Sequence, residues 1–325
     1  MVASREEPRS GRRFGVLAAL LMAAGGLAIL FFLLTGPRPA LPPPFRSAQG
    51  PSAASLAWFD RSGRRLEVLG SSADYLLPRL SPDGRRIAAD LVDGRTHRRD
   101  VWLYDLESRA WARFTADPSS ASLPIWSPDG RRIVFSSTRK GPSDLYEKAA
   151  GGLEAEELLF SSETAKDATD WSTDGRFIAF TSKERDSETG CDLWILTLAE
   201  RRATPFLETR AEERGGVFSP DGASIAYSSN ESGKDEVYVR PFPGPGDPRR
   251  ISTEGGSFPR WRRDGKEIFY VAPGNRVMSA PAGAGSGKDT GSPRELFAPK
   301  MTFARFYDVS PDGQRFLISL SNQTE

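Results

Sequence analysis

The sequence contains very little of the side-chain chemistry on which most enzymes and metal sites depend. Among 325 residues there is one histidine, His97, and one cysteine, Cys191. A lone cysteine cannot close an internal disulfide, so cysteine usage leaves the redox compartment open. One histidine and one cysteine also argue against a His- or Cys-rich metal site. The Gly-x-Ser-x-Gly elbow of the α/β-hydrolases is missing as well. The residues therefore predict no catalytic activity, no metal site and no cofactor.

A strong charge of either sign is also missing. The 44 Lys and Arg residues nearly balance the 43 Asp and Glu residues, and the formal net charge is +1. This balance provides no broad basic surface for nucleic acid, so we expect no nucleic-acid partner. The hydrophobic content of 38% is enough for one large domain or two.

What the sequence does contain is a repeated unit of strand, turn and strand, seen most clearly between Trp126 and Phe135. Serine, proline and glycine at the first, second and fourth turn positions suit a type I turn, and the aspartate can bond its own backbone. The apolar residues that follow, Ile133 and Phe135, alternate as in a half-buried strand. Six copies occur, with their aspartates at Asp83, Asp129, Asp174, Asp221, Asp264 and Asp312.

The spacing of these aspartates, 43 to 48 residues, predicts the architecture. A period in the 40s with several strands per repeat is typical of propeller blades. Two further strands, in Leu56–Leu69, precede the first copy, and the last copy almost ends the chain. We therefore expect the N-terminal pair to supply the outer strands of the last blade, which leaves no open edge. The prediction is an all-β, six-bladed propeller over residues 56–325.

An uncharged run of 21 residues, 14–34, lies near the N-terminus. At about 1.5 Å per residue it would span roughly 30 Å, the thickness of a bilayer core. Arginines cluster before the run, which predicts a cytoplasmic N-terminus and an exported propeller. A cleaved signal peptide is the alternative, but its apolar region is usually shorter. The predicted parts are a cytoplasmic stub (1–13), a single transmembrane helix (14–35), a Pro/Ala/Ser-rich linker (36–55) and the propeller.

The turn-strand pattern resembles the TolB-like, WD-like propeller repeats of bacteria. Longer motifs, such as Tyr238-Val239-Arg240-Pro241-Phe242-Pro243-Gly244, resemble the extracytoplasmic propeller of membrane-bound bacterial serine/threonine protein kinases. The resemblance implies a kinase before the span, for which 13 residues are too few. It also implies one more apolar strand after Glu325. The chain is accordingly expected to be either a piece of a longer receptor or an independent anchored propeller in the bacterial inner membrane.

Candidate site residues come from two places in the repeat. The residues just before the aromatic position of each innermost strand are Arg79, Ile125, Asp170, Val217, Arg260 and Asp308. Ring closure should place Asp308 between Arg260 and Arg79, while Asp170 has no charged neighbour in this register. The loops that lead into the innermost strands form the second place, since function commonly lies in loops on a rigid scaffold. The predicted ligand-binding residues are Tyr75, Asp167, Asp170, Arg214 and Arg305.

The predicted function is that of a membrane-anchored, non-catalytic module that binds a protein or small-molecule ligand outside the cytoplasm, as a sensor or receptor part. The alternative is a propeller hydrolase or lyase with its site in the central channel. A scaffold in a periplasmic protein complex, by analogy with TolB-like propellers, is a third hypothesis.

Overall fold

The computed structural model describes residues 55–70, 73, 75–93, 95–183, 190–283, 291–299 and 302–321. The predicted stub and transmembrane helix, and the linker up to residue 54, lie outside these residues. In the described part of the chain, we find no helix with the length and apolar character needed to cross a membrane.

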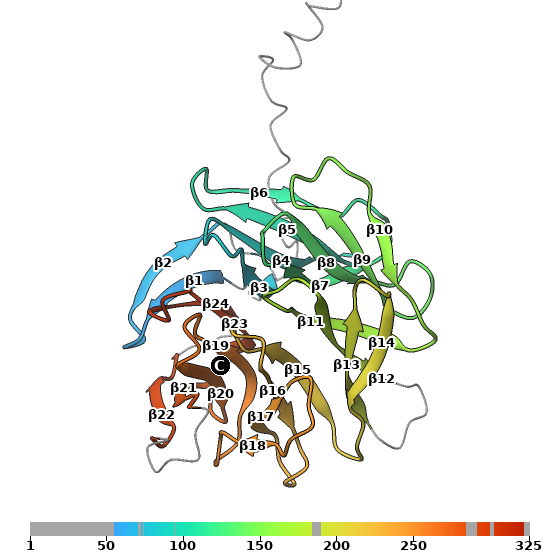
Figure 1. The fold of residues 1–325 in the computed structure, drawn as a ribbon. Coiled ribbons are helices and arrows are strands. Elements are labelled where there is room, and N and C mark those ends of the chain that lie inside the picture. The colour runs from blue at the N-terminus through green and yellow to red at the C-terminus, as the bar shows by residue number, and fades with distance from the viewer. Residues whose placement is uncertain are drawn as a thin grey trace, which may run out of the picture. The chain divides into compact units, whose positions relative to one another are not determined.

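The described chain folds into six sheets of four antiparallel strands (Figure 1). Blade 1 contains β3 (Tyr75–Leu80), β4 (Arg86–Val92), β5 (Arg99–Asp105) and β6 (Ala110–Arg113). Blade 2 contains β7 (Ala121–Trp126), β8 (Arg132–Ser137), β9 (Asp144–Ala149) and β10 (Glu157–Phe160). Blade 3 contains β11 (Ala165–Trp171), β12 (Phe177–Lys183), β13 (Cys191–Thr197) and β14 (Arg202–Leu207).

The other three blades follow the same order from the inner to the outer strand. Blade 4 contains β15 (Glu213–Phe218), β16 (Ser224–Ser229), β17 (Glu236–Pro241) and β18 (Arg249–Arg250). Blade 5 contains β19 (Ser257–Trp261), β20 (Glu267–Ala272), β21 (Arg276–Pro281) and β22 (Arg294–Phe297). Blade 6 contains β23 (Thr302–Val309), β24 (Arg315–Ser321), β1 (Ser55–Asp60) and β2 (Arg65–Leu69).

The blades form a closed ring, because each innermost strand contacts the innermost strands of both neighbouring blades, including β23 against β3. The predicted six-bladed architecture is confirmed. So is the closure: β1 lies antiparallel to β24, with Ala57 opposite Ile318 and Trp58 opposite Leu317 (Figure 1). One blade is thus assembled from both ends of the described chain, and the ring has no unpaired gap.

The second strand of each blade is more buried than the sequence indicates. Ile133, Val134 and Phe135 are all fully buried, so β8 is not the half-buried strand that its alternation predicts. Each sheet packs between two other sheets, and its two faces therefore enter different clusters, Ile133 and Phe135 on one side and Val134 on the other. Continuous apolar runs are what such doubly covered strands require.

The six turns adopt the predicted chemistry. In blade 2 the Gly130 amide donates to the Ser127 carbonyl at 2.8 Å, which closes the turn. The Ser127 hydroxyl donates to Asp129 Oδ1 at 2.6 Å, and the Arg131 amide donates to the same oxygen at 3.0 Å. Gly130 has φ of 69°, a conformation that glycine adopts without steric cost. The aspartates of the repeat therefore serve the turn.

This geometry gives a stability prediction for Asp129. The Ser127 hydroxyl is the largest cause that holds the pKa of Asp129 below its usual value. Asp129→Ala should lower the free energy of unfolding by about 1 kcal/mol, the net value of such hydrogen bonds. The wild-type advantage should disappear as the pH falls through the lowered pKa, because the acid then protonates. Urea denaturation at neutral and acidic pH measures both effects.

A matched control exists in blade 5, where Arg262 replaces the turn serine. There Asp264 accepts the Lys266 amide at 3.1 Å and pairs with Arg262 at 3.4 Å, with no hydroxyl donor. Asp264→Ala should therefore cost less than Asp129→Ala. Equal losses at the two positions would contradict this account of the turn.

The innermost strands each carry an irregularity that shapes the channel. In four blades a residue with positive φ stands two positions before the register residue: Leu77 (46°), Leu123 (59°), Gly215 (65°) and Phe258 (58°). Non-glycine residues adopt this conformation rarely, and bulky ones least of all. Such bulges bend the strand and re-aim side chains. The bulge thus decides what each blade presents near the loop end of its inner strand.

Candidate functional site

The channel has two ends, which we name by what surrounds them. The loop mouth is the end where the innermost strands begin. Residues 121–122, 166–167, 213–214 and 257–258, which the sequence predicts as loops, lie at the start of β7, β11, β15 and β19 at this end. The turn mouth is the end where these strands run into the six repeated turns. Each end carries a separate cavity, and the predicted site residues are divided between them.

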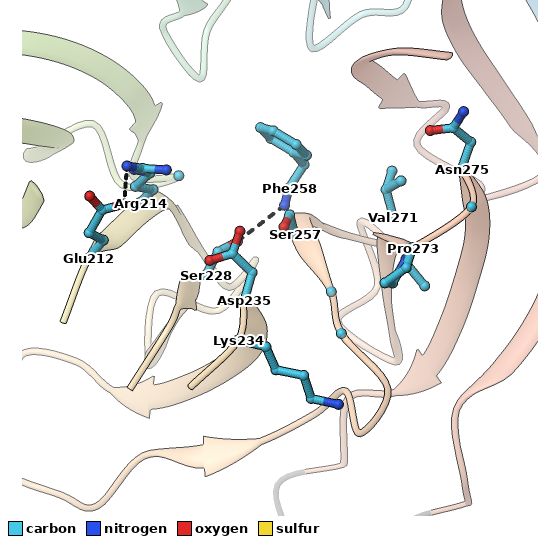
Figure 2. Close-up of a pocket in the computed structure, with 15 residues that line it drawn as sticks. Glu212, Arg214, Ser228, Lys234, Asp235, Ser257, Phe258, Val271, Pro273 and Asn275 are labelled. Atoms are coloured by element: carbon cyan, nitrogen blue, oxygen red, sulfur yellow. Dashed lines mark hydrogen bonds and ion pairs between the residues drawn. The ribbon is translucent and has the colours of Figure 1, made fainter. Parts of the chain in front are cut away.

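At the loop mouth a pocket of about 440 Å³ lies between blades 4 and 5. Its size falls in the range of small-ligand pockets. Figure 2 shows Arg214 and Asn275 on opposite sides, with Phe258 between them. The lining combines charged, polar and apolar side chains: Glu212, Arg214, Ser228, Lys234, Asp235, Ser257, Phe258, Val271, Pro273 and Asn275.

Glycines keep this pocket open. A Cβ on Gly256 would stand 2.8 Å from the Ser252 hydroxyl and 2.9 Å from Tyr270, and one on Gly255 would stand 2.8 Å from Pro273. The chain that forms the wall is therefore packed as closely as a backbone without side chains allows. Larger residues here would push the wall into the pocket or into the core.

The charges in the pocket are held by specific partners. Arg214, with half of its side chain exposed, forms an ion pair with Glu212. Lys234 donates to the Thr253 carbonyl at 3.1 Å and lies 3.2 Å from the buried carboxylate of Glu236. Because exposed ion pairs contribute little to stability, Arg214 is held in place yet can exchange its partner. Arg214 is the predicted site residue that the structure places in this pocket.

Phe258 occupies its place through the bulge of β19. Its amide donates to the Ser228 hydroxyl of blade 4 at 3.2 Å, and its φ of 58° turns the ring away from an ordinary strand position. Gly215 holds the same bulge position in blade 4. Leucines hold this position in blades 1 and 2. The Phe258 ring packs against the buried cluster that contains Phe269 and Phe316, and it also lines the pocket.

The other predicted residues lie elsewhere. Tyr75 is fully buried and stacks on Trp111 with ring centroids 5.0 Å apart. This is a correction to its predicted ligand contact, because the ring fills the core between blades. Asp167 is exposed at β11, where the surrounding protein raises the pKa of its carboxyl and the Arg99 charge opposes the shift. The side chain of Arg305 lies outside the described part of the structure.

Asp170 lies at the turn mouth, beside a cavity of about 290 Å³. All six register residues line this cavity: Arg79, Ile125, Asp170, Val217, Arg260 and Asp308. Burial raises the pKa of Asp170 to about 6, and the charges of Arg79 and Arg260 oppose the rise. Within the register, the adjacent blades place the uncharged Ile125 and Val217 beside Asp170, as expected, and the charges that act on it come from blades farther round the ring. The channel is narrow enough that side chains interact across it as well as between adjacent blades.

The predicted charge cluster at the closure is confirmed for Arg260 and Asp308, whose Nε and Oδ1 atoms lie 3.6 Å apart. Asp308 also accepts the Leu80 amide at 2.7 Å and so joins blade 6 to blade 1. The guanidinium of Arg79 crosses to blade 3, where Nη2 donates to the Thr169 carbonyl at 3.1 Å. Blade order alone does not reveal that crossing.

Within the described ranges, no group of three or more His, Cys, Asp or Glu side chains is arranged to hold a metal ion. Among the polar residues that sequence reasoning missed, Lys234 and Asn275 stand on the hairpin turns between the second and third strands of blades 4 and 5. A glycine beside each, Gly233 and Gly274, marks the turn but does not indicate a pocket.

The closed ring and its repeated turns define a six-bladed β-propeller. Residues 59–191 match the PD40 family, the TolB beta propeller domain. A Tol-Pal system protein TolB from Helicobacter pylori is 26% identical over 163 residues, which cover 49% of this chain and 38% of that protein. The match therefore spans about half of this chain and well under half of the relative.

Solved structures show the same fold. A putative TolB from Agrobacterium tumefaciens superposes with a TM-score of 0.68 at 18% identity, over 84% of this chain and 99% of that chain. An oligogalacturonate lyase in complex with manganese superposes with a TM-score of 0.53 at 12% identity, over 84% of this chain and 98% of the lyase. Identities this low compare folds only, so they do not choose between a binding protein and an enzyme. The particular resemblance to kinase-associated propellers is not among these matches and stays a prediction.

Proposed function

We propose that this propeller is a non-catalytic module that binds a partner protein through the pocket at its loop mouth. The observation that carries the proposal is the pocket between blades 4 and 5, which is lined by Phe258, a residue with positive φ, and by Arg214. An aromatic residue beside an arginine is the composition of protein-binding hot spots. The relative's name, Tol-Pal system protein TolB, supports a place in a protein assembly.

The remaining parts of the predicted function are proposed with it. The uncharged run 14–34 would anchor the chain in the bacterial inner membrane, with the propeller on the far side from the cytoplasm. A sensor or receptor role would then follow, because the propeller would bind its partner outside the cytoplasm while the N-terminal run anchors the chain in the membrane. A topology assay with reporter fusions after residue 55 tests the anchor: activity of an exported reporter supports it, and activity of a cytoplasmic reporter contradicts it.

The binding experiment uses the full chain and a purified Pal protein from the same bacterium. Phe258→Gly should weaken binding by about tenfold, as expected for an aromatic hot spot. The backbone should tolerate the change, because Gly215 adopts φ of 65° at the same bulge position of blade 4. Arg214→Glu should weaken binding to a similar extent, since it reverses an exposed charge in the pocket. Isothermal titration calorimetry measures both.

The matched control is Arg131→Glu, an exposed arginine at the turn mouth, which should leave the affinity unchanged. Folding of each variant is checked by thermal melting. A folded Phe258→Gly variant that binds Pal as tightly as the wild type would reject the pocket as the binding site. Absence of any wild-type binding would reject Pal as the partner.

An enzyme with its site in the channel is the second candidate. The observation in its favour is Asp170, a carboxyl at the channel end whose pKa is raised to about 6, within reach of general acid–base chemistry near neutral pH. The fold it shares with the oligogalacturonate lyase makes oligogalacturonate the first substrate to assay. Turnover that is lost in Asp170→Asn would support this candidate over the binding module.

A further inference from the structure

The cavity at the turn mouth holds two carboxylates that are already engaged. Asp308 accepts the Leu80 amide with Oδ2 at 2.7 Å and the Val309 amide with Oδ1 at 2.9 Å. Asp170 accepts the Phe218 amide with Oδ2 at 2.8 Å. These bonds join blade 6 to blade 1 and blade 3 to blade 4. The two aspartates therefore have a structural reason to be there that needs no ligand.

Two of the three arginines that line the cavity, Arg79 and Arg260, are less well satisfied. A guanidinium carries five N–H donors. Arg79 donates through Nη2 to the Thr169 carbonyl at 3.1 Å, and Arg260 donates through Nη1 to the Pro259 carbonyl at 2.7 Å. In the described part of the chain, Arg260 Nε is buried and has no hydrogen-bond acceptor. Buried donors without an acceptor destabilise the fold, so an acceptor from outside would be stabilising.

The charges around Arg79 and Arg260 also bear on whether the cavity can bind an anion. Burial lowers the pKa of Arg79 to about 10, and the positive charge of Arg260 lowers it further against the pull of Asp308 and Asp170. None of the ion pairs found among the described residues involves Arg79. Asp170 and Asp308 balance the two charges, so what the pair offers a bound carboxylate is its unused N–H donors, Arg260 Nε among them.

The size and rim of the cavity limit what can enter. A volume of about 290 Å³ is at the lower end of ligand pockets and suits a few heavy atoms. The rim is built from the turns and the residues beside them, and it combines apolar side chains with two polar ones: Pro82, Pro128, Trp171, Pro220, Trp261 and Pro311, with Thr173 and Arg263. Its apolar part suits a short carbon chain behind the charged group.

We propose that the turn mouth is a second binding site, in which Arg79 and Arg260 hold the carboxylate of a small organic acid or of a peptide end. The site is separate from the pocket at the loop mouth and is built from register residues of all six blades. It extends the function of the ring from one face to both. A partner bound at the loop mouth leaves the turn mouth free for this ligand.

The experiment titrates succinate into the full chain and uses succinamide as the uncharged control. Succinate should bind and succinamide should not. Arg260→Gln should weaken succinate binding at least about tenfold, the loss expected when a charge-assisted pair is removed. Arg214→Gln, at the loop mouth, should leave succinate binding unchanged. If the protein binds succinate but not Pal, the proposed function fails and this site stands. If it binds Pal but not succinate, this site fails and the proposed function stands.

A gain of affinity keeps the test decisive even if the arginine variants unfold. Asp170→Asn should tighten succinate binding several-fold, because a negative charge leaves the site while the amide oxygen can still accept the Phe218 amide. The tripeptide Gly-Gly-Phe, with its C-terminal amide as the control, shows which carboxylate the site prefers. Tighter binding of Gly-Gly-Phe than of succinate assigns the site to a peptide C-terminus. Tighter binding of succinate assigns it to a small organic acid. Equal binding of succinate and succinamide, or a folded Arg260→Gln variant with wild-type affinity, would overturn the proposal.

Discussion

Ala57→Arg should unfold the propeller at a much lower urea concentration than the wild type. Ala57 is fully buried on β1, opposite Ile318 of β24, in a cluster with Phe59, Phe269 and Phe316. An arginine there would bury a charge without a partner or expel β1 from blade 6. Either outcome should cost on the order of 4 kcal/mol or more, a large fraction of the stability of a typical domain.

The same hairpin provides the control. Val68 on β2 pairs with Ala57 but is 49% exposed, so Val68→Arg should change the free energy of unfolding by no more than about 0.5 kcal/mol. Limited proteolysis should cleave the Ala57→Arg variant within 55–70, because an expelled hairpin is accessible. If Ala57→Arg keeps the wild-type urea midpoint, the closure by β1 does not hold the ring together.

Much of the ring could be predicted because its information is local. The Ser-Pro-Asp-Gly turns specify their own hydrogen bonds, and six turns at one spacing specify six blades. The outer strands could be predicted less well. The apolar pattern indicates a strand over residues 250–252, whereas β18 is Arg249–Arg250 and Ile251 and Ser252 lie beyond it, both buried. An outer strand packs on one neighbour only, so its side-chain pattern is weak.

The sites could be predicted only in part, because they depend on distances between blades. The Arg260–Asp308 pair joins adjacent blades, and the order of the repeats was enough to predict it. The contact from Arg79 to Thr169 crosses the channel, and only the channel width decides it. The wall of the loop-mouth pocket contains Gly255 and Gly256. The reason for glycine at these positions is visible only in the structure, where a Cβ would come too close to Pro273 and Tyr270.

One signal was present in the repeats and was missed. The fifth residue of the second strands reads Asp90, Ser136, Thr181, Ser228, Val271 and Ser319 around the ring. Three of the hydroxyls accept an amide from the next blade: Ser136 from Ala168 at 3.1 Å, Thr181 from Gly215 at 3.4 Å and Ser228 from Phe258 at 3.2 Å. Asp90 accepts the Leu123 amide at 3.0 Å in the same way. A carboxylate thus stands where the ring needs only a hydroxyl.

Asp90→Ser should make the protein more stable at pH 8 and change its pH dependence. Asp90 is fully buried, and its Oδ2 has no hydrogen-bond donor among the described residues, although Arg99 Nη1 lies 3.8 Å away. Burial raises the pKa of Asp90 to about 7. The Arg99 charge, the Leu123 amide and the Arg79 charge oppose this rise, whereas the negative charge of Asp167 adds to it. Since the folded state holds the proton more tightly, the stability from this group is present below about pH 4 and is lost as the pH rises through about 7.

A rise of the pKa from the ordinary aspartate value of 3.8 to about 7 corresponds to a loss of roughly 4 kcal/mol as an upper limit. The serine variant lacks this loss, so its stability relative to the wild type should rise steadily between pH 4 and pH 8. Asp93→Asn in the next loop is the matched control of opposite sign, because the Thr96 and Arg95 amides lower the pKa of Asp93. The stability difference between that variant and the wild type should change only below about pH 4, where the wild type loses the advantage of its carboxylate, and should stay constant between pH 4 and pH 8. Urea denaturation across this range decides the matter: a pH-independent difference between Asp90→Ser and wild type would show that Asp90 keeps an ordinary pKa, and that the ring tolerates its carboxylate without cost.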